Sequence, residues 1–209
     1  MLLLFAFAMD STVDLWAAAH RHPQWYAAAQ MCSRYFAWHW LMVLAVAGLA
    51  CAWLSKRRAW IRVLCAMIMA ASLAGLSADL LRGMTGRTRP YYREVPQGFY
   101  GVRHDSRWLI TKHAFNSFPS GHTAAITGFA VPLLWWRRRL LLVIVPLIGA
   151  VGAARIYLGS HHLSDVLASV VLGSWVAAWS RRLIDSRKWR LGRGGAEDVV
   201  ETAASPAAD

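Results

Sequence analysis

Acidic residues are scarce in this chain of 209 residues, in which 11 Asp and Glu stand against 23 Lys and Arg. A hydrolytic centre with two metal ions needs several clustered carboxylates, so this shortage argues against such a centre. Cysteine is rarer still, with three residues that form no C-x-x-C pair and have no histidine pair beside them. A glycine-rich nucleotide-binding loop is also missing. We therefore expect no metal and no cofactor, and we interpret the cysteines as packing residues.

Apolar residues, in contrast, are abundant and are gathered into separate runs long enough to cross a bilayer. They make up 57% of the chain, and the mean hydropathy is +0.34. This distribution is typical of a polytopic membrane protein. The net charge of +12 would suit a nucleic-acid-binding protein, but the Lys and Arg residues lie in short clusters between the apolar runs. We interpret these clusters as topology signals and phosphate ligands, and we expect no nucleic-acid partner.

The fold class predicted from these runs is all-α, a polytopic membrane helical bundle with five spans and an N-terminal helix at the interface. Residues 1–8 are apolar but too short to span, and no basic residue precedes them as it would in a signal peptide. Residues 10–31 mix aromatic and charged side chains, which is typical of an interfacial helix, here broken near Pro23. The predicted spans cover residues 35–54, 60–81, 120–136, 140–158 and 163–179.

The same pattern divides the chain into three segments. We expect an N-terminal interfacial segment at residues 1–31 and a transmembrane domain at residues 32–181. A tail at residues 182–209 follows, which is first basic and then small, acidic and low in complexity. Such a composition favours disorder close to the membrane surface.

Three tight basic clusters indicate how the spans are oriented. Residues 56–58, 137–139 and 181–182 fall on one side of the predicted membrane, which the positive-inside rule makes the cytoplasmic side. The loop from Arg82 to Phe118, the longest in the chain, then faces outward together with the turn at residues 159–161. Loops of this length are usually functional. The candidate polar residues therefore collect at the outer face.

The stretch from Ala154 to Asp165 places one arginine, two histidines and one aspartate between two apolar runs. Charge in such a position is costly, so function is the default hypothesis, with a membrane-buried ion pair as the structural alternative. His161 and Asp165 are four residues apart and share one face of a regular helix. The carboxylate would accept from one ring nitrogen and leave the other free to attack. Arg155 would add a forked positive charge that matches phosphate oxygens.

This stretch carries the last of three motifs on the outer face: Arg82-x6-Arg89-Pro90, Pro119-Ser120-Gly121-His122 and Arg155-x5-His161-x3-Asp165. In order and spacing they closely resemble the signature of the type 2 phosphatidic acid phosphatase superfamily, which also includes the vanadium haloperoxidases. That signature reads K-x6-RP, PSGH and SR-x5-H-x3-D, so the chain departs from it at Arg82 and Ala154. Arg82 keeps the positive charge, and neither change touches a histidine or Asp165.

The resemblance implies a mechanism and a set of site residues. His161 would attack phosphorus to form a phosphohistidine, Asp165 would stabilise the ring, and His122 would protonate the leaving oxygen and then activate water. Spacing alone would allow the two histidines to exchange roles. The transferring phosphoryl group would be bound by three arginines and by the free N–H groups at the start of a helix, that is, by Arg82, Arg89, Arg155, Ser120 and Gly121.

We expect the remaining histidines to have no catalytic role. A helix would turn His162 about a quarter-turn away from its neighbour, so we expect it behind the site or at the interface. His104 and His113 lie in the long loop, where an exposed histidine is more often solvated than catalytic. His20, His22 and His39 are expected at the membrane interface.

The expected function is that of an integral-membrane lipid phosphatase acting on a lipid phosphate or diphosphate, in a bacterial inner membrane with its site facing the periplasm or outside. Among known family substrates, undecaprenyl diphosphate fits a small five-span enzyme of this orientation. Lipid A 1-phosphate and phosphatidylglycerol phosphate are close competitors, because the apolar residues do not identify a lipid tail. A lipid phosphotransferase would need the same site, and a non-catalytic scaffold or transporter is the alternative from another class. The expected partners are the bilayer and a phospholipid or isoprenoid phosphate, and the sequence leaves the oligomeric state open.

Overall fold

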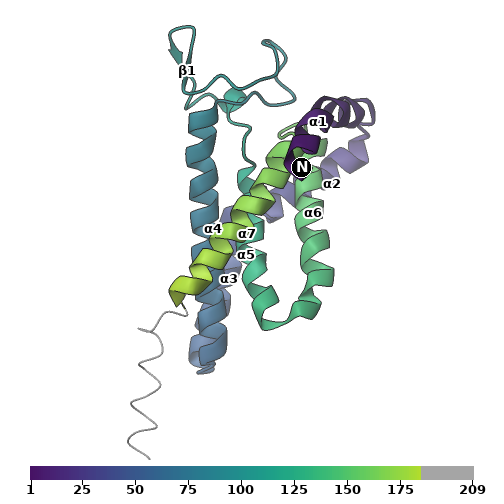
Figure 1. The fold of residues 1–209 in the computed structure, drawn as a ribbon. Coiled ribbons are helices and arrows are strands. Elements are labelled where there is room, and N and C mark those ends of the chain that lie inside the picture. Colours follow the sequence, from purple (N-terminus) through teal and green to yellow (C-terminus); the bar gives the residue numbers. More distant parts are fainter. Residues whose placement is uncertain (185–209) are drawn as a thin grey trace, which may run out of the picture.

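A computed structural model describes residues 1–184 of the chain (Figure 1). In this part the chain forms seven α-helices: α1 (Leu2–Ala19), α2 (Pro23–Tyr35), α3 (Trp38–Leu54), α4 (Arg58–Thr85), α5 (Gly121–Trp136), α6 (Leu141–Tyr157) and α7 (Leu163–Ile184). Shorter elements are β1 (Arg103–His104), β2 (Arg107–Trp108) and two 3-10 turns, η1 (His113–Phe115) and η2 (Arg138–Leu140). Most of the tail predicted at 182–209 lies outside the described residues.

The helices match the predicted membrane bundle. Within residues 1–184, four helices are long and apolar enough to cross a membrane, namely α1, α4, η2 with α6, and α7. α2 and α3, which are bent by 48° at their junction, would together supply a fifth. α5 has 16 residues and packs against α4, α6 and α7 inside the bundle (Figure 1). The predicted all-α fold class is therefore confirmed.

The bundle is centred on α4, α5 and α7, which approach one another closely because their facing side chains are small. Ala66, Ala70, Ala74 and Ala78 repeat every fourth residue along α4, and all four are buried. A Cβ atom added at Gly128 of α5 would lie 2.6 Å from the Ala70 carbonyl oxygen. Stripes of small residues allow helix backbones to come together in this way in membrane proteins.

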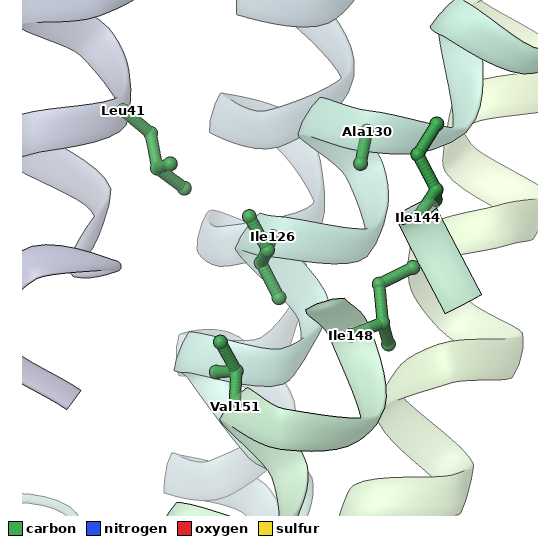
Figure 2. Close-up of a cluster of buried hydrophobic side chains, with 6 residues drawn as sticks. All are labelled: Leu41, Ile126, Ala130, Ile144, Ile148 and Val151. Carbon is green, nitrogen blue, oxygen red and sulfur yellow. The ribbon is translucent and has the colours of Figure 1, made fainter. Parts of the chain in front are cut away.

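Larger apolar side chains fill the space between α3, α5 and α6. Figure 2 shows them pointing toward one another across the three helices: Leu41, Ile126, Ala130, Ile144, Ile148 and Val151. With this second cluster, α5 is held on one side by alanines and on the other by branched side chains. The start of α5 is thus placed by packing on two sides.

The N-terminal helix differs from the prediction. α1 begins at Leu2 and continues without a break through the apolar residues 1–8, since the chain has neither proline nor glycine before Ala19. It lies across one end of the bundle, beside the ends of α6 and α7 (Figure 1). One face of α1 is buried there, through Ala6, Asp10 and Ala17. The break predicted near Pro23 is confirmed, because α2 starts at that residue.

The long polar loop closes the same end of the bundle. It leaves α4 through Gly86, whose φ of +57° ends the helix in a left-handed turn and leaves no room for a side chain beside Gly101. The loop then folds on itself through the β1–β2 hairpin and η1 before it enters α5. The basic turns after α3 and α5 lie at the opposite end (Figure 1). All three predicted motifs therefore meet at one end of the molecule.

Candidate active site

The structure brings all the predicted site residues together at the loop-covered end of the bundle. Arg82 lies in the last turn of α4, Arg89 follows in the loop, and Arg155 lies in the last turn of α6. The charges of all three arginines act on His122, and those of Arg155 and Arg89 also act on His161. The other positions open α5 or α7 or lie just before α7: Ser120, Gly121, His122, His161 and Asp165.

His161 is fully buried, and its hydrogen bonds determine which ring nitrogen is free. Its Nδ1 atom lies 2.7 Å from the carbonyl oxygen of Ser117. A carbonyl oxygen only accepts, so Nδ1 carries the hydrogen and Nε2 carries the lone pair. Nε2 is buried without a hydrogen-bond partner. A buried, unpartnered nitrogen with a lone pair is the state required of a nucleophile.

Burial also lowers the pKa of His161 to about 4, and the positive charges of Arg155 and Arg89 act in the same direction. The negative charge of Asp165 opposes them but does not outweigh burial. The imidazole is therefore neutral at physiological pH. It keeps its lone pair without needing a base to remove a proton.

Asp165 holds the site together in a different way from the one predicted. Its Oδ2 atom lies 3.8 Å from His161 Nδ1, which is too long for a hydrogen bond. Instead, Oδ2 accepts from the Ser117 hydroxyl at 2.6 Å and from the His162 backbone N–H at 2.8 Å. Oδ1 accepts from Arg87 Nη1 at 2.5 Å. The carbonyl of Ser117 therefore orients the histidine, while Asp165 supplies a nearby negative charge.

Two of the motif arginines have hydrogen-bonding capacity to spare. Arg89 Nη2 donates to the Asn116 carbonyl at 3.2 Å, and Arg155 Nη1 donates to the Ser33 hydroxyl at 2.6 Å. The Nε atoms of both arginines are buried without a partner. Burial lowers the pKa of Arg89 from its usual range. Buried guanidinium groups with unsatisfied N–H donors are what an anion-binding site requires.

The start of α5 supplies the third side of this site. The Ser120 hydroxyl caps the helix by accepting from Thr123 N at 3.5 Å. The Ser120 backbone N–H donates to the Asp165 carbonyl at 3.3 Å, so it does not point at a ligand as predicted. Gly121 and His122 follow, in the first turn, where N–H groups lack an intrahelical acceptor. A Cβ at Gly121 would lie 2.8 Å from Arg82 Nη2, so glycine lets this guanidinium lie across the helix end.

A groove of about 560 Å³ opens beside His122 between α3, α4 and α5. Its polar end is formed by Asp79, which pairs with Arg82, and by His122. The rest is lined mainly by small or apolar side chains, including Trp38, Gly75, Leu76 and Ala125. The groove thus joins a polar end, which contains Arg82 and His122, to an apolar lining along the helices.

Sequence reasoning missed several polar residues that surround the site. Ser117 and Arg87 contact Asp165 through their side chains, and the Ser117 carbonyl accepts from His161, but contacts between such distant positions leave no mark in a sequence. Asp10 and Asp14, on α1, also reach the site. Two acids four residues apart in an apolar helix were a usable signal, because intramembrane charge usually has a partner.

His162 lies behind the site, which is one of the two positions predicted for it. Its Nε2 atom is 3.0 Å from the Thr88 carbonyl and its Nδ1 atom is 2.5 Å from Asp14 Oδ2. Burial acts to lower the pKa of His162, but the hydrogen bond to Asp14 and the charge of Asp165 raise it overall. Both nitrogens face acceptors, so this histidine links α1 to the loop behind the site.

Within residues 1–184, no group of three or more His, Cys, Asp or Glu side chains is arranged to hold a metal ion. The site is instead made of arginine donors, helix N–H groups and two histidines. Such a set binds a phosphate-like anion and offers one neutral nitrogen for attack on it.

Comparisons with known proteins agree with this chemistry. The model of the PAP2 superfamily matches residues 60–189. A lipid A 1-phosphatase of Rhizobium etli is 34% identical over 105 residues, which are 49% of this chain and 42% of the relative. Lipid phosphate phosphatase 1 of Arabidopsis thaliana is 32% identical over 139 residues, covering 56% of this chain and 42% of the relative. The chain therefore spans less than half the length of these curated relatives.

Two solved structures share the fold. Aquifex aeolicus LpxE superposes with a TM-score of 0.59 and 16% identity, covering 83% of this chain and 95% of the other. A transmembrane PAP2-type phosphatidylglycerolphosphate phosphatase from Bacillus subtilis superposes with a TM-score of 0.63 and 20% identity, covering 88% and 94%. At these identities the likeness concerns the fold alone.

Proposed function

Because the chain belongs to the PAP2 superfamily, we propose that it is an integral-membrane lipid phosphatase that acts through a phosphohistidine on His161. One observation carries this proposal. The Nε2 atom of His161 is buried, unprotonated and unpartnered, and it lies among arginines with unsatisfied N–H groups. A neutral nucleophile inside a cationic cage is suited to attack on a phosphoryl group.

The reaction proceeds in two displacements. His161 Nε2 attacks phosphorus while the bond from phosphorus to the lipid oxygen breaks, and His122 gives that oxygen a proton. The phosphorylated ring is a cation, which the carboxylate of Asp165 at 3.8 Å stabilises. His122 then takes a proton from water, whose oxygen attacks phosphorus and releases inorganic phosphate and free His161. The family resemblance assigns the proton transfers to His122.

The arginines stabilise charge in both displacements. Arg82, Arg89 and Arg155 bind the equatorial oxygens, together with the N–H groups of Gly121 and His122. These donors are held in place by other contacts, Arg155 by Ser33 and Arg89 by Asn116. A preorganised cage of this kind needs no metal ion to neutralise the developing charge.

The groove beside His122 supports a lipid as the substrate. The phosphate would lie at its polar end, beside Arg82 and His122, and the apolar chain would extend between α3, α4 and α5. The basic turns at the opposite end of the bundle make the site face outward, which in a bacterial inner membrane is the periplasmic side. The lipid thus reaches the site from the outer leaflet.

Lipid A 1-phosphate is the first candidate substrate, because two rhizobial relatives named lipid A 1-phosphatase are each 34% identical over 105 residues. Undecaprenyl diphosphate, favoured from the sequence, is the second, since the groove beside His122 has a largely apolar lining along which an isoprenoid chain could extend. Phosphatidylglycerol phosphate is the third, because the Bacillus subtilis neighbour in fold is a phosphatidylglycerolphosphate phosphatase.

The proposal is tested by measuring phosphate release from detergent-purified protein with EDTA present. The substrates are lipid A, undecaprenyl diphosphate, phosphatidylglycerol phosphate and phosphatidate, and a His161→Ala preparation measures the background. We expect release from one lipid well above this background and unchanged by EDTA. Release only after addition of an acceptor lipid would indicate a phosphotransferase. No release from folded protein under either condition would favour a non-catalytic role.

The pH dependence of kcat/KM follows from burial of His161. Because its pKa is about 4, the nucleophile is neutral throughout the physiological range. We expect protonation of His161 to leave kcat/KM, corrected for ionisation of the substrate phosphate and of His122, unchanged down to about pH 5 and to lower it only as the pH approaches about 4. Initial rates between pH 3.5 and 8, with circular dichroism to verify folding, provide the measurement. An acid limb near 6.5 would mean that the nucleophile is solvated.

A further inference from the structure

One face of α1 points into the catalytic end of the bundle. Phe7, Asp10 and Asp14 are spaced by three and four residues, so their side chains leave the helix on the same side. Asp10 is only 6% exposed, although it is an acid in an otherwise apolar helix. A buried carboxylate needs specific partners, and those of Asp10 belong to the active site.

Asp10 binds two elements that are far away in the sequence. Its Oδ1 atom accepts from the Ser164 backbone N–H at 2.9 Å. Its Oδ2 atom accepts from the Ser164 hydroxyl and from Arg87 Nη2, both at 2.6 Å. The carboxylate therefore caps the start of α7, one residue before Asp165, and at the same time holds Arg87.

Arg87 connects Asp10 with Asp165. Its Nη2 atom binds Asp10 and its Nη1 atom binds Asp165 Oδ1 at 2.5 Å, so the two branches of one guanidinium serve two carboxylates. The Phe7 and Phe99 rings lie 5.0 and 4.8 Å from its central carbon. Because the guanidinium is planar and rigid, anchoring one branch determines where the other points.

This bridge also affects the charge that His161 experiences. Two carboxylates share one arginine, so the group of three keeps a net negative charge next to the imidazole. Without the charge of Asp10, Arg87 would neutralise Asp165 alone and would be free to shift toward it. The phosphorylated, cationic ring would then lose stabilisation that the neutral ring does not need.

We propose that Asp10 is a positioning residue of this site, which acts through Arg87 to hold the orientation and charge of Asp165 beside His161. On this view α1 is a part of the phosphoryl-transfer site and not only an interfacial segment. The inference rests on the proposed function, since it assigns Asp10 a role in the same reaction. It adds a residue outside the three motifs, which lies 72 positions before Arg82, where the first motif begins.

The test is the Asp10→Asn variant, which keeps the shape of the side chain and removes its charge. We expect kcat to fall about 10- to 100-fold, as for other residues that orient a reacting group, while KM changes less than about threefold. Asp105→Asn is the matched control, because it removes an exposed acid from the same end of the molecule. An Asp10→Asn enzyme with the kcat of the control would overturn the proposal.

A double-mutant cycle separates positioning from mere support of the fold. Arg87→Lys keeps a charge but cannot bridge two carboxylates, so it should lower kcat to a similar extent. If Asp10 acts through Arg87, the double variant should lose no more than about the larger single loss. Losses in kcat that multiply would show that Asp10 acts independently of Arg87 and would refute the bridge.

Orthovanadate binding, measured calorimetrically, tests the inference without turnover. Vanadate resembles the pentacoordinate phosphoryl group, so its affinity should weaken in Asp10→Asn by about the same factor as kcat/KM. If wild-type protein hydrolyses no lipid, the proposed function fails, and equal vanadate affinity in the two proteins would then refute the inference as well. If Asp10→Asn does not fold, Ser164→Ala is the second variant, because it removes one hydroxyl from the same bridge. We expect vanadate affinity to weaken about three- to tenfold in this variant, which corresponds to about one hydrogen bond. Unchanged vanadate affinity in Ser164→Ala would count against the bridge.

Discussion

Replacement of His161 by alanine is expected to lower kcat for lipid phosphate hydrolysis by at least about 10⁴-fold, because it removes the atom that attacks phosphorus. The arginine cage remains, so KM should change little. The substitution also removes the hydrogen bond to the Ser117 carbonyl, but it leaves every contact of Asp165 in place. The variant should therefore fold and bind substrate, yet not turn it over.

The measurement is phosphate release under single-turnover and steady-state conditions, with His104→Ala as the control, since that histidine is partly exposed in the β1–β2 hairpin at the same end. Acid-labile phosphate on the protein identifies the intermediate. It should be detected in wild-type protein quenched during turnover and should be absent in His161→Ala. A His161→Ala protein that retains a tenth of wild-type activity would exclude this residue as the nucleophile.

Replacement of Asp165 by asparagine is expected to lower kcat about 10²- to 10³-fold and the free energy of unfolding by about 3 kcal/mol. Where an aspartate fixes the histidine tautomer, its amide variant loses about 10⁴-fold. Here the Ser117 carbonyl fixes the tautomer, so the loss should be smaller and should reflect the missing charge alone.

The stability effect arises because Asp165 accepts from three donors. Its two oxygens bind Arg87 Nη1, the Ser117 hydroxyl and the His162 N–H. The amide nitrogen of asparagine would face at least one of these donors, which would leave it buried and unsatisfied. Arg87 keeps Asp10 as a partner in this variant. The loss in free energy of unfolding should therefore lie at the lower end of the range typical of a broken buried ion pair.

Steady-state kinetics and denaturation in detergent would measure these two effects of Asp165→Asn. Glu94→Gln is the control, because it removes a carboxylate that contacts only the exposed hydroxyl of Tyr92. An unchanged kcat together with lowered stability would restrict Asp165 to a structural role. A loss of 10⁴-fold or more would mean that Asp165, not Ser117, orients the histidine during the reaction.

The sequence alone predicted most of the architecture and the motif residues of the candidate site. Apolar runs of spanning length and the turns between them predicted α3 to α7 to within a few residues, except that α4 and α7 extend four and five residues beyond their predicted ends. Three motifs in register identified the residues that the fold later brought together. Helix periodicity and motif spacing are local properties, so a sequence displays them directly.

The tertiary structure alone decided how those residues are held. The acceptor of His161 is a backbone carbonyl 44 residues away, and Asp10 meets Ser164 across 154 positions. α1 carries its acids into the site only because Ala6 and Ala17 let its face dock on the bundle. Every residue carries a main-chain oxygen, so the sequence does not mark the one that binds His161. Which side chains meet is set by packing between helices that are distant in the sequence, so no local pattern could predict these contacts.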